Sequence, residues 1–171
     1  MPIKGLIMIR WGVVMSLVFS TVVLAAGAVP ADWQASWIWM QRDRYDGYND
    51  TIEARRVFEL GPVASASLRI TADTRYRLYL NGEWVNDGPG RSWPDHYQYD
   101  VIDVTPYLKP GKNDIRVIAK FYGIGTFHQL PAEAGFLAQL DVYDAEGQRI
   151  STLGTDDTWE VREAAAWARW A

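Results

Sequence analysis

The chain contains no cysteine, which excludes disulfide bonds, thiolate zinc sites and thiol nucleophiles together. It has only two histidines, His96 and His128, and these stand far apart, so a zinc site is not expected. Basic residues are also few, because 17 Lys and Arg stand against 21 Asp and Glu. An acidic chain without clusters of Lys and Arg is not expected to bind nucleic acid.

One long uncharged apolar run stands near the N-terminus, from Trp11 to Ala26. Lys4 and Arg10 precede it, and the small residues Ala26-Gly27-Ala28 end it. This order is typical of a secretory signal peptide over residues 1–28, and the run of 16 residues is short for the alternative, a membrane anchor. We therefore expect a secreted or periplasmic protein with no membrane contact after signal cleavage.

Cleavage after residue 28 would leave residues 29–171, which is the length of one domain. The loss of Lys4 and Arg10 with the signal would leave 15 basic residues against 21 acidic ones, a net charge of −6. The mature domain is thus expected to form a single core that is stabilised by packing alone.

Alternation of apolar and polar residues with period two dominates after residue 50, with turns at short intervals, as in an all-β sandwich. Asn81-Gly82 separates two such runs and predicts a two-residue hairpin turn, because both residues tolerate positive φ. The polar segment 43–51 is interpreted as a surface loop. The sequence predicts strands over residues 54–60, 68–72, 76–80, 115–121, 136–142, 149–153 and 159–161.

The segment 91–97 gathers side chains that suit a sugar. An aromatic ring can cover the apolar face of a pyranose, while charged and polar groups fix its hydroxyls. The alternative is that Trp93 and Tyr97 plug the edge of the core or form a surface for another domain. The candidate ligand-binding residues in the loop and around it are Trp84, Arg91, Trp93, Asp95, His96, Tyr97, Tyr122 and His128.

A series of short motifs follows in order along the chain, and together they resemble the N-terminal β-sandwich domain of bacterial alpha-L-rhamnosidases. The resemblance extends over residues 35–167 and implies a galactose-binding-like jelly-roll sandwich. The motifs are Trp37-Ile38-Trp39, Arg56-Val57-Phe58, Tyr79-Leu80-Asn81-Gly82, Gly88-Pro89, Tyr99-Asp100, Asp103-Val104-Thr105-Pro106-Tyr107-Leu108, Gly111-Lys112-Asn113, Tyr122-Gly123 and Thr155-Asp156-Asp157-Thr158-Trp159.

The resemblance also bears on catalysis. The family's enzymes continue into a helical barrel that carries their catalytic acids, and no position of this chain matches those acids. Glycoside hydrolysis usually needs two carboxyl groups facing each other across the sugar, and although carboxylates are available, spacing in the sequence cannot place any two of them in this way. We therefore expect a carbohydrate-binding or accessory domain that is not catalytic alone, or a fragment whose surface serves only as an inter-domain interface. The expected partner is a rhamnose-containing glycan or a glycosidase catalytic domain.

The resemblance to galactose-binding-like sandwiches implies calcium as a candidate ligand, although no cofactor is required for the expected role. Calcium prefers carboxylate and carbonyl oxygens. The candidate donors are Asp46, Asp87 and Asp95.

Overall fold

The computed structural model describes residues 32–40, 48–93, 96–125, 130, 133–164 and 166. The expected signal peptide, residues 1–28, lies outside them and stays a prediction. None of the helices in the described residues is long and apolar enough to cross a membrane. The elements are β1 (Asp50–Leu60), β2 (Ser65–Asp73), β3 (Arg75–Leu80), β4 (Glu83–Gly88), β5 (Asp100–Asp103), the 3-10 turn η1 (Thr105–Tyr107), β6 (Gly111–Phe121), β7 (Gly135–Tyr143), β8 (Arg149–Gly154) and β9 (Glu160–Glu163).

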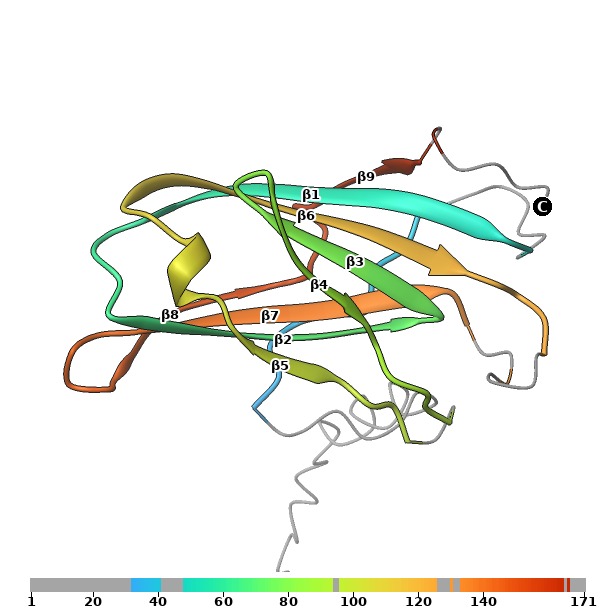
Figure 1. Ribbon diagram of the computed structural model, residues 1–171, viewed down its shortest axis with the longest axis horizontal. Coiled ribbons are helices and arrows are strands. Elements are labelled where there is room, and N and C mark those ends of the chain that lie inside the picture. The colour runs from blue at the N-terminus through green and yellow to red at the C-terminus, as the bar shows by residue number, and fades with distance from the viewer. Residues whose placement is uncertain are drawn as a thin grey trace, which may run out of the picture.

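The strands form two antiparallel sheets that face each other across one core, so the predicted all-β sandwich is confirmed (Figure 1). One sheet has the order β4-β3-β6-β1-β9 and the other has the order β5-β2-β7-β8. The inward positions are apolar in alternation with outward polar ones, as period two requires. The largest fully buried apolar side chains are Ile52, Leu68, Ile70, Leu78, Leu80, Ile115, Phe136 and Leu140.

The predicted two-residue turn joins β3 to β4. Asn81 has φ 50° and Gly82 has φ 85°, which are the left-handed values expected of a type I′ hairpin. The Asn81 amide nitrogen also donates to the Tyr107 carbonyl at 2.7 Å, and its oxygen accepts from the Asp114 amide at 3.0 Å. The same side chain therefore shapes the turn and ties it to neighbouring segments.

Strand β7 is buried on both faces. The alternation in the sequence predicted that only one face would point into the core and that Gln139 and Asp141 would lie on the other, more polar face. Its inward residues fill the core, while Gln139 and Asp141 are covered from outside by the segment 32–40. The Gln34 amide donates to Gln139 at 2.6 Å, and Ile38 exchanges two backbone hydrogen bonds with Phe136, each 3.1 Å long. Arg69 then bridges Asp141 at 2.8 Å and Asp32 at 2.7 Å.

The structure corrects two boundaries. Asp50 and Thr51 were assigned to a loop, but they begin β1 and are buried, because Asp50 lies opposite Phe121 and Thr51 opposite Lys120 in the ladder with β6. The last strand was expected from Trp159, but β9 starts one residue later. The Trp159 side chain instead enters the core, where it meets Phe136 edge to face at 5.7 Å.

Candidate functional site

One end of the sandwich, which we call the rim, is formed by the β2–β3 turn at Asp73–Thr74, the described parts of the loop after β4 (residues 89–93 and 96–99) and Tyr122 after β6. The Thr74 amide donates to the Lys120 carbonyl at 2.7 Å, and the Tyr122 amide donates to the Thr74 hydroxyl at 3.1 Å. The Thr71 hydroxyl donates to the Gln98 carbonyl at 2.7 Å. These bonds join segments from both sheets, so the rim is held by the sandwich beneath it.

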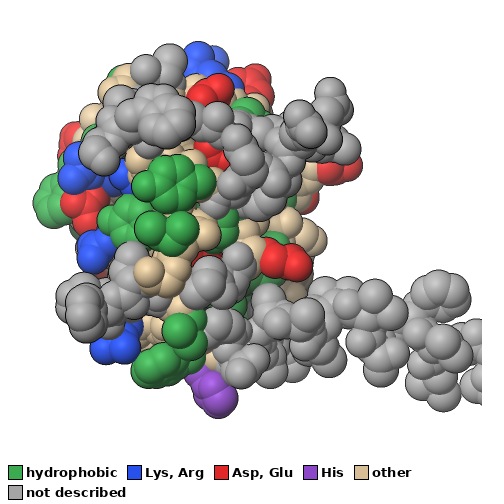
Figure 2. All heavy atoms as spheres, turned by 90° about the vertical axis from the view of Figure 1, so that its right-hand side faces the viewer, with side chains coloured by type: hydrophobic (Ala, Val, Ile, Leu, Met, Phe, Trp, Pro, Cys, Tyr) green, Lys and Arg blue, Asp and Glu red, His purple; other side chains and the backbone are tan. Residues whose placement is uncertain are grey.

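The exposed part of the rim is centred on Trp93. Its backbone pairs with that of His96, since the His96 amide donates to the Trp93 carbonyl at 2.8 Å. The Trp93 side chain is 51% exposed, and the Arg91 guanidinium lies 4.9 Å from its ring centroid. Figure 2 faces this end of the molecule and shows hydrophobic and basic side chains on it, with a histidine projecting at the lower edge. Trp93, Arg91 and His96 are thus brought together at the surface.

Tyr97 anchors the same loop. Its ring packs against Trp37 at 5.1 Å between centroids, and its hydroxyl donates to the Asp73 carboxylate at 3.2 Å. Burial raises the pKa of Asp73 above its usual range, although the hydroxyls of Thr74 and Tyr97 counteract that shift. Burial and the neighbouring Asp73 charge raise the pKa of Tyr97, which keeps the phenol protonated as a donor. Tyr97 is therefore half-buried and holds the loop in place.

The loop leaves β4 through a tight contact at Gly88. A Cβ on Gly88 would overlap the Asp100 carboxylate and would lie 2.8 Å from the Tyr76 hydroxyl. Tyr76 itself donates to Asp100 and accepts from the Asn86 amide at 2.8 Å. Burial and the Asp100 carboxylate raise the Tyr76 pKa, so this hydroxyl also remains a donor. The start of the loop is fixed by these buried polar contacts.

A hollow of about 250 Å³ on the outer face of the five-stranded sheet reaches the rim at Tyr122. Arg75, Thr51 and Gly88 also line it, and the Lys120 ammonium lies 5.3 Å from the Tyr122 ring centroid. Polar and cationic groups therefore stand next to a half-buried aromatic ring here. Tyr122 reaches the rim as the sequence predicted, although it is part of this hollow rather than of the Trp93 surface.

Trp84 does not join the rim loop. It lies opposite Tyr79 near the start of β4, whereas the loop 89–99 follows the other end of that strand. Its indole NH donates to Asp87 at 3.2 Å. Two other candidates, Asp95 and His128, lie outside the described residues and stay predictions.

Asp87 is not suited to act as a calcium ligand. Its two carboxylate oxygens accept from the Arg77 guanidinium at 2.8 and 2.9 Å, and this cation lowers the Asp87 pKa. Asp46 and Asp95 lie outside the described residues, and the described residues contain no group of three or more metal-ligating side chains. Calcium at the two other donors stays a prediction.

Sequence reasoning missed the residues that build the rim from below. Tyr76 lies in the predicted strand 76–80, where it looks like an ordinary inward residue, and Asp73 lies one residue beyond the predicted strand 68–72. A carboxylate at the end of a strand, directly before a turn, is the one signal that could have indicated Asp73. Its pairing with Tyr97, 24 residues later, depends on the fold.

The comparisons with known proteins agree with the fold. Residues 61–169 match the family model of the alpha-L-rhamnosidase N-terminal domain. No curated protein matches the sequence.

Solved structures are also similar. A GH78 family rhamnosidase of Bacillus sp. GL1 is 36% identical with a TM-score of 0.67, over 77% of this chain and 13% of that one. The Aspergillus terreus alpha-L-rhamnosidase is 29% identical with a TM-score of 0.66, over 79% of this chain and 17% of that one. The Pleurotus ostreatus lectin is 26% identical with a TM-score of 0.54, over 75% of this chain and 34% of that one.

The chain thus spans less than a fifth of the length of either rhamnosidase. The family match covers more than half of this chain, and the sandwich and the rhamnosidase structures agree with it. The chain belongs to the alpha-L-rhamnosidase N-terminal domain family.

Proposed function

We propose that the chain is a carbohydrate-recognition module of a rhamnosidase-type glycoside hydrolase and that its rim binds a rhamnose-containing glycan. The observation that carries the proposal is the half-exposed Trp93 ring beside Arg91 on an anchored loop. An exposed indole offers an apolar face to a sugar ring, and a guanidinium supplies planar donors for its hydroxyls.

Each rim residue has a distinct role in this proposal. Trp93 stacks on the sugar, while Arg91 and His96 donate hydrogen bonds from the same surface. Tyr97 acts as a positioning residue, because its hydroxyl and ring are engaged with Asp73 and Trp37. Since the loop is already held by these contacts, less conformational entropy is lost when the sugar binds.

A titration of the full chain with L-rhamnose and with rhamnose-containing oligosaccharides tests the proposal, with calorimetry as the readout. We expect saturable binding by the wild type and no detectable binding by Trp93→Ala. Trp84→Ala is the matched control, because Trp84 is 56% exposed but lies away from the loop. Equal binding by Trp93→Ala and the wild type would refute the role of the rim.

The second candidate function is contact with a glycosidase catalytic domain. The outer face of the four-stranded sheet exposes Tyr99 and Val101, and the Trp33 ring meets Tyr99 edge to face at 5.5 Å. Exposed apolar side chains that lie together are typical of interaction surfaces. Val101→Asp should reduce association with a separately produced rhamnosidase barrel while leaving L-rhamnose binding unchanged, and unchanged association would contradict this role.

A further inference from the structure

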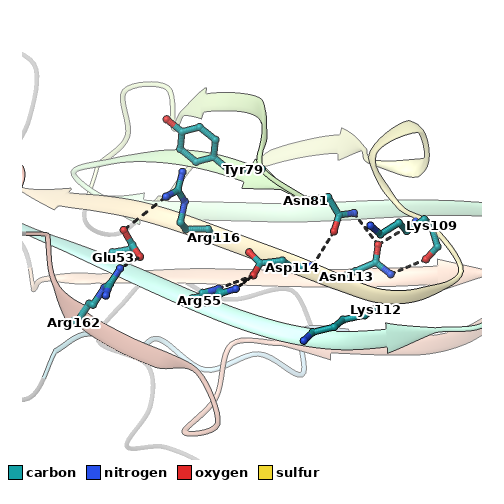
Figure 3. Close-up of a pocket in the computed structure, with 11 residues that line it drawn as sticks. Glu53, Arg55, Tyr79, Asn81, Lys109, Lys112, Asn113, Asp114, Arg116 and Arg162 are labelled. Atoms are coloured by element: carbon teal, nitrogen blue, oxygen red, sulfur yellow. Dashed lines mark hydrogen bonds and ion pairs between the residues drawn. The ribbon is translucent and has the colours of Figure 1, made fainter.

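A second hollow, of about 610 Å³, lies on the outer face of the five-stranded sheet, beside the β3–β4 turn (Figure 3). We call it the cationic groove. Its walls come from outward side chains of β1, β3, β6 and β9, together with Lys109 before β6. Asn81 and Lys112 lie at the end of the strands remote from the rim, because β3 and β6 run from one end of the sandwich to the other.

The groove carries more positive than negative charge, although the whole chain has a net charge of −4. Two carboxylates, Glu53 and Asp114, stand among five basic side chains, which gives a local excess of three positive charges. The basic side chains are Arg55, Lys109, Lys112, Arg116 and Arg162.

The two carboxylates are already engaged. Asp114 accepts from the Arg55 Nε at 2.6 Å. Glu53 accepts from Arg162 at 2.7 Å and lies 4.0 Å from Arg116. These pairs satisfy Arg55 and Arg162, so the remaining positive charge belongs to Arg116, Lys109 and Lys112.

The two lysines are available to a ligand. Among the residues that the structure describes, neither Lys109 nor Lys112 has an ion-pair partner, and both are exposed. Their backbone is nevertheless fixed, because the buried Asn113 side chain accepts from the Lys109 amide at 3.0 Å and donates to its carbonyl at 2.7 Å. The ammonium groups therefore project from a rigid turn.

Aromatic rings border the same groove. The Arg116 guanidinium lies 4.5 Å from the Tyr79 ring centroid, which orients this cation. Trp84 on β4 is the register partner of Tyr79 and is 56% exposed. Trp84 does not itself line the groove, and its indole NH is held by Asp87, but as the register partner of Tyr79 it stands beside a residue that does line it.

We propose that the cationic groove binds an acidic polysaccharide, with its carboxylates on Lys109, Lys112 and Arg116 and one sugar ring against Trp84. The lining residues extend along β6 from Lys112 to Arg116 (Figure 3), which suits a linear polymer. The exposed indole favours a glycan over an acidic polypeptide, because a pyranose has an apolar face to stack on it. This site goes beyond the sugar site at the rim, since the two share no residue.

Polygalacturonate, a linear polymer of uronic acid, is the probe for the test. The full chain should bind it in calorimetry at 50 mM salt and more weakly at 200 mM salt, because salt screens exposed charges. Lys109→Gln with Lys112→Gln should weaken binding roughly tenfold, because each exposed charge pair contributes up to about fivefold. Trp84→Ala should weaken binding as well, whereas Trp93→Ala should leave it unchanged.

The matched control is Arg75→Gln with Lys120→Gln, which removes two positive charges from the same sheet at the hollow beside Tyr122, away from the cationic groove. This variant should bind polygalacturonate as the wild type does, and neutral dextran should not bind. No binding of polygalacturonate by the wild type, equal weakening by the control variant, or equally tight binding of polyglutamate would each overturn the proposal. These outcomes leave L-rhamnose binding at the rim untouched, so the two proposals fail separately.

Discussion

Replacing Tyr97 with Phe tests whether the rim loop is anchored by the bond to Asp73. The substitution removes only the hydroxyl, which donates to Asp73 at 3.2 Å, and keeps the ring that packs against Trp37. The Asp73 side chain, 2% exposed, would then retain the Thr74 hydroxyl at 3.0 Å as its remaining donor among the described residues. One oxygen of a buried carboxylate would lose its partner.

The structure sets the size of the effect. Loss of a partner for a buried polar group costs about 1–3 kcal/mol. Because the bond from Tyr97 to Asp73 is long, at 3.2 Å, we expect the lower end of this range, about 1 kcal/mol. For a domain of this size, that corresponds to a decrease in melting temperature of roughly 3–4 °C. Urea unfolding followed by near-ultraviolet circular dichroism measures the difference in unfolding free energy.

The pH dependence gives a second readout. A hydroxyl binds an ionised carboxylate more strongly than a protonated one, so this contribution is present when Asp73 is ionised. It should decrease as pH falls through the folded pKa of Asp73, which burial has raised. The cost of Tyr97→Phe should therefore be larger at neutral pH than in acid.

Tyr99→Phe is the control for this experiment. Tyr99 is two residues away and 40% exposed, and its ring meets Trp33, so the change removes a hydroxyl without removing a buried bond. Its unfolding free energy should stay within about 0.5 kcal/mol of the wild type. If Tyr97→Phe and Tyr99→Phe proved equally stable at every pH, the anchor would have no energetic basis.

Three further predictions concern the hairpin and the base of the loop. Asn81→Ala should cost about 3 kcal/mol in a urea melt, because its side chain makes three hydrogen bonds, and Glu83→Ala should be near neutral by comparison. Gly88→Ala should cost more than about 2 kcal/mol through overlap with Tyr76 and Asp100, whereas Gly90→Ala, with open space around it, should not; equal stability would contradict the contact. Asp87→Asn should be less stable than the wild type at neutral pH, since Arg77 lowers the Asp87 pKa, and this gap should close as pH falls below about 4; a gap independent of pH would argue against the pair.

Much of the fold is determined by local features of the sequence. Alternation with period two assigned the inward faces of β1, β3 and β6, because each strand buries one face against the same core. Asn81-Gly82 specified its turn because few residues tolerate positive φ. The ordered motifs also identified the family, which the family model confirms.

The candidate site was predicted only in part. The composition of the segment 91–97 suggested a sugar-facing loop but left open whether Trp93 would plug the edge of the core, and in the structure Trp93 is exposed beside Arg91 and His96. The sequence could not separate Trp84 from this surface. Trp84 lies at the start of β4 and Trp93 follows its end, so the six-residue strand places the two side chains in different parts of the molecule. It also gave no sign that Tyr97 would be held by Asp73.

The sequence by itself determined which residues alternate, where the hairpin turns and which loop is rich in aromatic and charged groups, because these are properties of neighbouring residues. Only the tertiary structure decided what covers the outer face of β7 and which cations share the groove beside Trp84. Gln34 meets Gln139, and Glu53 meets Arg162, across more than a hundred residues. Such contacts depend on how the strands are ordered in the sheets, which no local pattern encodes.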